Sequence, residues 1–378
     1  MKLILIFLLP LFSVSSYASA KEQFVTKKEF HLSSYTTTSG EKIKNVLVGY
    51  ESYGTMNESK SNVILVTHYF SGNSHAAGKY TASDVAPGYW DSIIGPGKPL
   101  DTNKYFIISS DCLVNLGVHD PWVRTTGPAS INPDTGKPYG MTFPKIKVTD
   151  FVQVQRQLLN SLHINKLYAV VGASGGAAQA MEWATLYPND VERVVAVVPP
   201  GLSQAPYVVA LLNRWANPIT LDPQWKNGNY DPQSRVPLKG LIESLKQITL
   251  SAVYFDFGPR DSSQIESFLE DRAIARAKLT DANSLIYTAR AMMTFDVEKK
   301  AADIKAEVLF VPAEKDMIFP PELAFDAAKK LCTLGKRAEV FVMKGRGGHI
   351  DGLTGVAAAS AQISQFLERP LGTSKVCE

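Results

Sequence analysis

The chain has 378 residues, of which 45% are hydrophobic, and carries a formal net charge of +3 at pH 7. This hydrophobic content suffices for a large buried core, and the length suits one elaborated domain or two. A charge so close to neutral, without basic blocks or aromatic–basic stripes, argues against nucleic acid and acidic membrane surfaces as partners.

Residues 1–20 have the pattern of a secretory signal peptide. Lys2 precedes a short apolar stretch, and Ala18-Ser19-Ala20 matches an A-x-A cleavage site. The apolar stretch is too short to span a bilayer, so we expect cleavage after Ala20 and no stable membrane anchor. The mature protein would then begin at Lys21, in the periplasm or outside the cell.

The next segments predict the first strands of a sheet. Residues 30–53 alternate between polar and apolar side chains and are interrupted at Ser39-Gly40, which predicts an antiparallel hairpin at a sheet edge. The apolar runs 62–68 and 105–110 predict buried strands. Residues 111–144 are polar and contain several Pro and Gly, so we expect a long loop, and loops of this length are usually functional.

Residues 149–188 contain the most informative motif. Thr149 is expected to cap a helix, and the apolar run 167–171 predicts a buried strand. A G-x-S-x-G with Ser174 at its centre follows, and then an Ala-rich helical pattern that ends near Pro188. This is the pattern of a nucleophile elbow, whose tight turn needs small residues two positions before and after the serine.

Ser174 is therefore the candidate nucleophile. The alternative is a small residue in a glycine-rich turn that binds phosphate. The chain lacks both G-x-G-x-x-G and G-x-x-x-x-G-K-[ST] at this point, which disfavours that alternative.

The second half of the chain alternates strands and helices with one interruption. The alternation predicts a mostly parallel sheet with helices on both faces, formed by residues 21–200 and 301–378. Residues 201–300 are helical in pattern and predict a helical lid inserted after the sixth strand, with a separate small helical domain as the alternative. The predicted strands here are 191–198, 307–312 and 338–343, and the predicted helices are 321–331 and 356–368.

A base and an acid for Ser174 are found at the ends of the last two strands. His349 is the only histidine after Ser174, and it lies in a glycine-rich loop. Asp316 follows the strand before it, with Glu314 as the second choice, so the chain order Ser, Asp, His is that of this elbow type. The alternatives are a surface histidine and a solvated loop charge.

Two backbone amides are expected to form an oxyanion hole. The first is the N–H of Gly175, directly after the serine, and the second is the N–H of Phe70, in the loop after the first parallel strand. His68 and His75, in the same loop, are interpreted as loop architecture.

Cys112, Cys332 and Cys377 have spacings that match neither a metal site nor a disulfide-rich framework. We therefore predict no metal and no cofactor. In an oxidising compartment Cys332 and Cys377 could pair, and the alternative is three unpaired thiols.

The sequence resembles the homoserine O-acetyltransferase branch of the α/β-hydrolase superfamily over residues 45–367. The resemblance implies the α/β-hydrolase fold, with Ser174 as nucleophile, Asp316 as acid and His349 as base. It also implies transfer of an acetyl group from acetyl-CoA to the hydroxyl of homoserine. The segments that carry it are HYFSGNSHAAG, PGYWDSIIGPGKPLDTNKYFIISSD, TGPASINPDTGKPYG, FPKIKVTDFVQVQ, VVGASGGAAQAMEWA, ITLDPQW and EKDMIFPPEL.

The chain also differs from this family at identifiable positions. Gly175 stands where the family elbow usually has methionine, which is expected to widen the acyl pocket or loosen the turn. Ile350 follows His349 where the family commonly has aspartate, and Asp351 comes one residue later. Arg214 is the candidate counterpart of a substrate-binding arginine in the family's lid. The family acts in the cytoplasm, and acetyl-CoA is not expected where an exported chain would work.

We therefore predict an exported serine hydrolase that cleaves a carboxylic ester through an acyl-enzyme. One alternative is an O-acyltransferase of the homoserine O-acetyltransferase type, and another is a non-catalytic binding protein on the same fold. The expected partner is a small-molecule ester or acyl substrate. The sequence leaves the oligomeric state open, with a homodimer as one option.

Overall fold

The computed structural model describes residues 23–234, 238–253 and 261–373. The strands are β1 (Lys28–Thr36), β2 (Lys42–Tyr53), β3 (Val63–Thr67), β4 (Ile94–Gly95), β5 (Leu100–Asp101), β6 (Phe106–Ser110), β7 (Ala169–Ala173), β8 (Arg193–Val197), β9 (Glu307–Val311) and β10 (Ala338–Val340). The α-helices are α1 (Val148–Ser161), α2 (Gly175–Leu186), α3 (Pro206–Leu221), α4 (Lys239–Ala252), α5 (Ser262–Ala277), α6 (Ala282–Met292), α7 (Pro321–Thr333) and α8 (Ser360–Glu368). The 3-10 helices are η1 (Gly140–Thr142), η2 (Pro223–Gly228), η3 (Pro232–Ser234), η4 (Glu298–Asp303), η5 (Gly348–Gly352) and η6 (Val356–Ala359).

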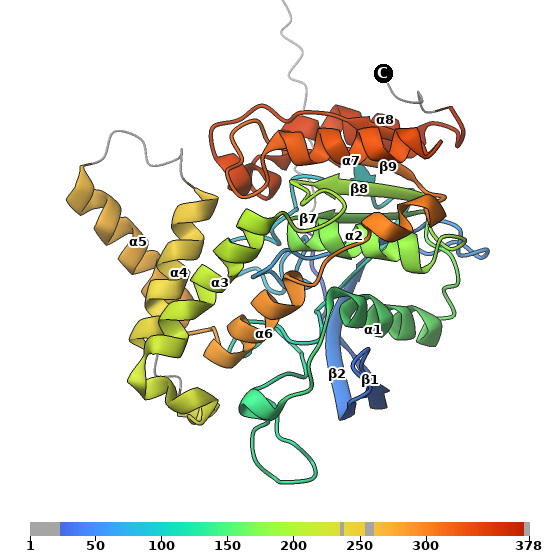
Figure 1. Ribbon diagram of the computed structural model, residues 1–378. Coiled ribbons are helices and arrows are strands. Elements are labelled where there is room, and N and C mark those ends of the chain that lie inside the picture. Colours follow the sequence, from blue (N-terminus) through green and yellow to red (C-terminus); the bar gives the residue numbers. More distant parts are fainter. Residues whose placement is uncertain (1–22, 235–237, 254–260, 374–378) are drawn as a thin grey trace, which may run out of the picture.

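An eight-stranded sheet forms the centre of the protein, in the order β1-β2-β6-β3-β7-β8-β9-β10 (Figure 1). The hairpin β1–β2 is antiparallel and pairs antiparallel with β6, while the pairs from β6 to β10 are parallel. This confirms the predicted mostly parallel sheet, with the antiparallel hairpin at its edge. The carboxyl ends of the parallel strands therefore meet at one edge, where ligands bind in such sheets.

Both faces of the sheet are covered, as the fully apolar strands require. In β3, Val63 and Leu65 pack into one core with side chains of α1, α2 and α7. The alternate residues Ile64 and Val66 pack into a second core with side chains of α8 and of the segment that contains Trp90. The fold is thus the predicted α/β-hydrolase architecture of a sheet between two helical layers.

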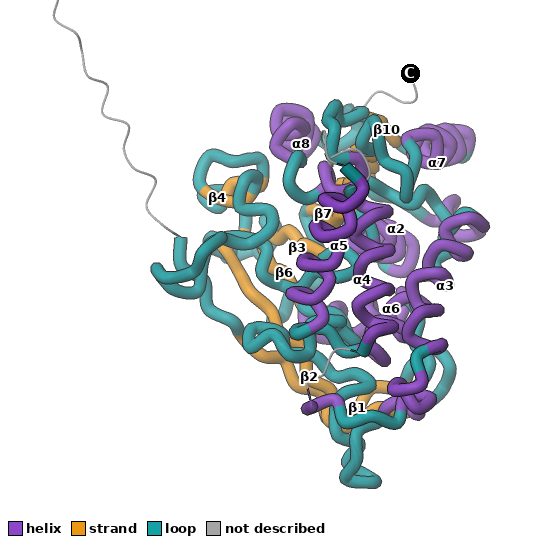
Figure 2. Tube along the Cα trace, turned by 90° about the vertical axis from the view of Figure 1, so that its left-hand side faces the viewer, coloured by secondary structure: helices purple, strands orange, loops and turns teal. Residues whose placement is uncertain are grey.

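The helices α3 to α6 form an insertion between β8, the sixth strand of the sheet along the chain, and β9. Figures 1 and 2 show α3, α4 and α5 side by side as one group beside the sheet. The Tyr207 hydroxyl of α3 donates a hydrogen bond of 3.0 Å to the Ile318 carbonyl in the loop between β9 and α7. The group therefore lies next to this loop.

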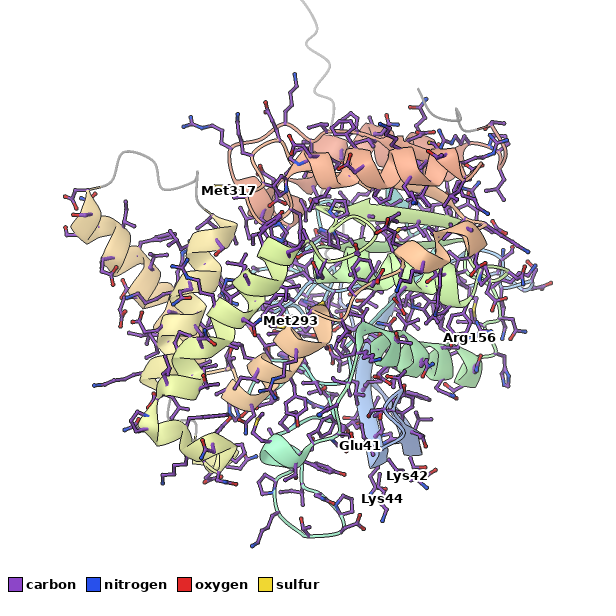
Figure 3. The ribbon with its side chains drawn as sticks, viewed as in Figure 1. Glu41, Lys42, Lys44, Arg156, Met293 and Met317 are labelled. Carbon is purple, nitrogen blue, oxygen red and sulfur yellow. The ribbon has the colours of Figure 1, made fainter. Side chains whose placement is uncertain are left out.

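The side-chain view separates two ends of the protein (Figure 3). Glu41, Lys42 and Lys44 lie at the free end of the β1–β2 hairpin, whereas Met317 lies in the loop between β9 and α7. The hairpin charges thus lie at the opposite end of the protein from the loop between β9 and α7.

Two expectations about helix starts need correction. The N-cap of α1 is Lys147 instead of Thr149, because the Asp150 carboxylate accepts the Lys147 N–H at 2.7 Å and closes the first turn from inside. The Thr149 hydroxyl donates instead to Glu182 at 2.7 Å. The last predicted helix begins as the 3-10 turn η6 before it becomes α8.

Two sequence predictions fall beyond the described ranges. The signal peptide and Cys377, one half of the Cys332–Cys377 pairing that the sequence left open, both lie outside them. Within the described residues, no helix combines the length and the apolar character that crossing a membrane requires.

Candidate active site

Ser174 occupies a strained turn between β7 and α2. Its φ is 56° and its ψ is −118°, a region that residues with a side chain rarely adopt. A Cβ at Gly172 would lie 2.2 Å from Thr67 Oγ1, and one at Gly176 would lie 2.1 Å from the Thr67 carbonyl oxygen. Both positions must be glycine because β3 and α2 pack against the turn at backbone distance, which is the geometry expected of the G-x-S-x-G.

The three residues Ser174, His349 and Asp316 come together although they are far apart in the sequence. His349 Nε2 lies 2.8 Å from Ser174 Oγ, and His349 Nδ1 lies 2.7 Å from Asp316 Oδ2. A carboxylate only accepts hydrogen bonds, so Nδ1 carries the imidazole proton and Nε2 accepts from the serine hydroxyl. All three side chains are buried, which protects this chain of hydrogen bonds from water.

Asp316 is held by the backbone of the loop that follows it. Its Oδ1 accepts the N–H of Ile318 at 2.8 Å and the N–H of Phe319 at 2.9 Å. The Phe319 ring also meets the His349 imidazole edge-to-face, with 5.3 Å between centroids. Glu314, the second choice for the acid, has a side chain that is 46% exposed.

Asp351 organises the loop that carries His349. Its Oδ2 accepts the N–H of Gly347 at 3.0 Å. Added Cβ atoms would lie 2.2 Å from its carboxylate at Gly345 and 2.8 Å from it at Gly355. The glycines that surround His349 in the sequence thus let the loop close around a buried carboxylate.

The amides of Gly175 and Phe70 lie beside the serine. Neither N–H has a hydrogen-bond acceptor among the residues that the structure describes. A Cβ at Gly175 would lie 3.3 Å from the Phe70 nitrogen, so the two amides are close neighbours. Two adjacent free donors are what a developing oxyanion needs.

Gly175 does not open additional space at the turn. A Cβ there would lie 3.2 Å from Met292 Sδ, so a side chain from the end of α6 fills the position. The wider acyl pocket expected from this glycine is therefore not present on the Met292 side.

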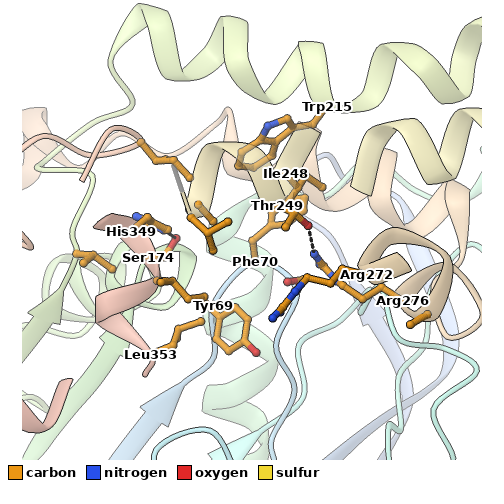
Figure 4. A pocket seen from close by; sticks show the side chains of 17 residues that line it. Tyr69, Phe70, Ser174, Trp215, Ile248, Thr249, Arg272, Arg276, His349 and Leu353 are labelled. Carbon is orange, nitrogen blue, oxygen red and sulfur yellow. Dashed lines mark hydrogen bonds between the residues drawn. The ribbon is translucent and has the colours of Figure 1, made fainter. Parts of the chain in front are cut away.

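A cavity of about 470 Å³ adjoins Ser174 and His349 (Figure 4). Its walls come from the loop after β3, from the loop that carries His349, and from α3, α4 and α5 of the helical insertion. Most of the lining is apolar, which is typical of small-molecule sites. The residues are Tyr69, Phe70, Ser71, Ser174, Val198, Trp215, Ile248, Thr249, Ala252, Val253, Arg272, Ala275, Arg276, Ile318, His349, Ile350 and Leu353.

The cavity contains two arginines that the sequence did not single out, Arg272 and Arg276. They lie four residues apart on α5, a spacing that places them on one helix face but equally fits a solvated face. Arg214 is exposed on α3 and does not line the cavity. Its predicted role in substrate binding gains no support from this position.

The other two histidines of interest are part of the framework. His68 Nε2 accepts the N–H of Cys112 at 3.1 Å, and burial lowers the pKa of His68. His75 Nδ1 lies 3.1 Å from the buried Glu51 carboxylate. The described ranges hold no group of three or more His, Cys, Asp or Glu side chains arranged to bind a metal ion.

Known proteins with similar sequences and structures are enzymes of acyl chemistry. Residues 137–351 match the family described as serine aminopeptidase, S33. A homoserine O-acetyltransferase from Citrifermentans bemidjiense is 35% identical over 377 residues, which cover 94% of this chain and 99% of that protein. The crystal structure of esterase E22 is 46% identical with a TM-score of 0.87, covering 91% of this chain and 100% of that one. Homoserine O-acetyltransferase from Bacillus anthracis is 36% identical with a TM-score of 0.88, covering 93% and 100%.

Proposed function

Since this chain belongs to the homoserine O-acetyltransferase-like branch of the α/β-hydrolase superfamily, we propose that it transfers an acyl group through a covalent intermediate on Ser174. The observation that carries the proposal is the hydrogen-bonded chain from Ser174 Oγ through His349 to Asp316, with distances of 2.8 and 2.7 Å. A serine hydroxyl is a weak nucleophile at neutral pH, and this arrangement supplies the base that it needs.

The reaction proceeds in two halves. Ser174 Oγ attacks the carbonyl carbon of an acyl donor while His349 Nε2 takes the serine proton, and the leaving group departs with that proton. An acceptor hydroxyl then gives its proton to His349 and attacks the acyl carbon, the bond from that carbon to Ser174 Oγ breaks, and His349 returns the proton to Oγ. Asp316 stabilises the imidazolium, and the Gly175 and Phe70 amides stabilise each tetrahedral oxyanion.

The acyl group on Ser174 can pass to an alcohol, and the relatives named homoserine O-acetyltransferase favour this acceptor. Proteins named homoserine O-acetyltransferase match this chain at 34–36% identity, and some do so over nearly its whole length. On this proposal the acyl group is acetyl and the acceptor is the hydroxyl of homoserine.

Transfer to water is the second candidate, and the likeness to esterase E22 favours it. That protein is named an esterase and is 46% identical over 91% of this chain, compared with 36% for the homoserine O-acetyltransferase from Bacillus anthracis. On this proposal, water replaces the alcohol in the second half of the same reaction.

A competition experiment separates the two acceptors. Purified protein is incubated with p-nitrophenyl acetate, with and without excess homoserine, and the products are analysed by mass spectrometry. Faster release of p-nitrophenol together with O-acetylhomoserine supports transfer to the alcohol. An unchanged rate with acetate as the sole product supports hydrolysis.

The nucleophile itself is tested by substitution and labelling. Ser174→Ala should lower kcat roughly 10⁴-fold or more, because the remaining groups lack a nucleophile to activate. A fluorophosphonate probe should label the unaltered protein and leave Ser174→Ala unlabelled. Absence of labelling and of ester turnover in the unaltered protein would instead favour the non-catalytic binding alternative.

The helical insertion and the signal sequence complete the proposal. The insertion, residues 201–300 in the sequence prediction, would act as a lid because Trp215, Ile248 and Arg276 line the cavity beside Ser174.

Export is supported by the sequence of residues 1–20 alone. Mass spectrometry of protein from a periplasmic fraction should find a chain that begins at Lys21, and an intact Met1 in the cytoplasm would contradict export.

A further inference from the structure

The helical insertion contacts the oxyanion hole through Met292, the last residue of α6. A Cβ at Gly175 would lie 3.2 Å from Met292 Sδ, 3.4 Å from Met292 Cε and 3.3 Å from the Phe70 nitrogen. The thioether and the Phe70 amide therefore lie on the same side of the Gly175 backbone. Met292 is buried, and the described residues that line the cavity beside Ser174 do not include it. The thioether thus supports the hole from outside the space that the substrate occupies.

The end of α6 is attached to the chain segment that leaves the sheet. The Met292 carbonyl accepts a hydrogen bond from Gln204 Nε2 at 3.1 Å. The Gln204 N–H donates to the Phe295 carbonyl at 3.1 Å, and the Val297 N–H donates to the Leu202 carbonyl at 2.8 Å. Leu202 and Gln204 belong to the loop between β8 and α3, so these bonds fix the place of Met292 relative to the sheet.

A second helix of the insertion contacts the other residue of the hole. The Phe70 ring packs against the Trp215 ring of α3, with 5.4 Å between the centroids and an interplanar angle of 58° (Figure 4). Such aromatic pairs stabilise a structure beyond the area that they bury. The two residues that supply the amides, Gly175 and Phe70, are thus packed against two different helices of the insertion.

The geometry of an oxyanion hole tolerates little movement. Both N–H groups must lie about 2.7–3.1 Å from one oxygen atom, and a misplacement of about 1 Å at an active site can cost roughly 100-fold in rate. Gly175 has no side chain with which to hold its own backbone in place. Methionine is flexible and fills irregular gaps, whereas an unfilled gap here would offer no contact that resists a shift of the amide.

We propose that Met292 is a positioning residue for the oxyanion hole. Its thioether packs on the Gly175 backbone and keeps the Gly175 and Phe70 amides directed at the same oxygen atom. The inference rests on the proposed acyl transfer at Ser174 and adds a residue of the insertion to that site. The insertion is then part of the catalytic apparatus as well as a wall of the cavity.

The first test removes the thioether. In Met292→Ala, kcat with p-nitrophenyl acetate should fall by about 10- to 100-fold, because the two amides lose their common support. Inhibition by phenylboronic acid should weaken by a similar factor. The boron of this inhibitor bonds to Ser174 Oγ while the serine proton passes to His349, so the adduct is tetrahedral and negatively charged. Met292→Leu should retain most of the activity, since it nearly conserves the volume.

Met181→Ala is the matched control. Met181 is a fully buried methionine of α2, so this variant also loses a thioether from the core. Its urea midpoint should fall as that of Met292→Ala does, because both changes leave a cavity. Its kcat and its inhibition by phenylboronic acid should change by less than about 3-fold, since the packing behind the oxyanion hole is retained.

A double variant tests the contact between Met292 and Gly175. In Gly175→Ala the methyl group would press on Met292 Sδ, so kcat should fall. In Met292→Ala that space is vacant and the same methyl group fits. The loss of kcat in the double variant should therefore be smaller than the product of the two single losses.

The outcomes separate this proposal from the one on which it rests. Equal kcat and equal boronate inhibition in Met292→Ala and Met181→Ala overturn the positioning role and leave acyl transfer at Ser174 intact. Single losses that multiply in the double variant also overturn it. An unaltered protein that turns over no ester and resists fluorophosphonate labelling overturns both proposals. Should Met292→Ala fail to fold, Met292→Val replaces it, because valine also lacks the sulfur and the terminal methyl group.

Discussion

At the scale of single residues, the two carboxylate oxygens of Asp316 have separate tasks. Oδ2 accepts a hydrogen bond from His349 Nδ1, whereas Oδ1 accepts hydrogen bonds from two backbone amides. The carboxylate therefore cannot rotate freely, and it holds the imidazole in the tautomer that leaves Nε2 open to Ser174.

Replacing this carboxylate by an amide should inactivate the enzyme without unfolding it. In Asp316→Asn the amide group keeps the shape but favours the wrong tautomer of His349, so we expect kcat to fall by about 10⁴-fold. Glu314→Gln, two residues earlier and exposed, is the matched control and should change kcat little. Similar losses in ester turnover for both variants would argue against Asp316 as the acid.

At the scale of elements, the contact between β3 and the first turn of α2 fixes the position of Ser174. Thr67 donates its hydroxyl proton to the Gly176 carbonyl at 2.8 Å, and its own carbonyl lies against the Gly176 Cα. Strand and helix are therefore in backbone contact, and the strained φ of Ser174 is imposed by elements that pack on both sides of it.

A methyl group at this contact should destabilise the fold and the site together. In Gly176→Ala the Cβ would meet the Thr67 carbonyl carbon and oxygen, which are backbone atoms that cannot turn aside. We expect a loss of about 1–3 kcal/mol in the free energy of unfolding, measured with urea. Gly117→Ala is the control, since its Cβ meets nothing closer than 3.4 Å and should change stability by less than about 0.5 kcal/mol.

Asp351, in the loop after β10 that carries His349, leads to a second prediction at this scale. Asp351→Ala should lower kcat by misplacing His349, because the Gly347 N–H loses its acceptor and the loop loses the carboxylate around which it folds. Asp351→Asn retains an oxygen acceptor and should recover part of the activity. A kcat for Asp351→Ala equal to that of the unaltered protein, measured with one neutral ester, would show that the carboxylate does not position His349.

Much of this arrangement was accessible from the sequence because strand ends are predictable. Ser174, Asp316 and His349 each follow an apolar run, and the carboxyl ends of parallel strands meet at one edge. The side chains supplied by the insertion were not accessible. Arg272 and Arg276 line the cavity together with residues of α3 and α4, and helical spacing alone does not reveal this packing. Arg214 lies in the same insertion but on an exposed face.

At the scale of the whole molecule, a buried charge cluster joins the strand β2 to the loop after β3. Glu51 lies 2.7 Å from Lys27 Nζ, and it accepts the hydroxyl of Tyr80 at 2.6 Å and that of Tyr53 at 2.7 Å. Burial alone would raise the pKa of Glu51, but the hydrogen bond to His75 and the charge of Lys27 outweigh burial and lower it.

This lowered pKa predicts how stability depends on pH. Because Glu51 is more acidic in the folded chain than in the unfolded one, its contribution is present above about pH 4.5 and is lost as the pH falls through the folded-state value. Urea unfolding should therefore show that Glu51→Gln is about 1–3 kcal/mol less stable at pH 7 and that the difference shrinks below pH 4.5. Profiles that run parallel down to pH 3 would contradict the assignment.

The sequence separation of Ser174 and His349, which are joined by a hydrogen bond, also determines when the protein can first become active. The two residues are 175 positions apart, so a ribosome that adds 5–20 residues per second needs roughly 9 to 35 s to supply the imidazole after the serine. During that interval the nascent chain holds a hydroxyl with no base to activate it. A chain that is still being synthesised is thus unable to form an acyl-enzyme with metabolites that it meets.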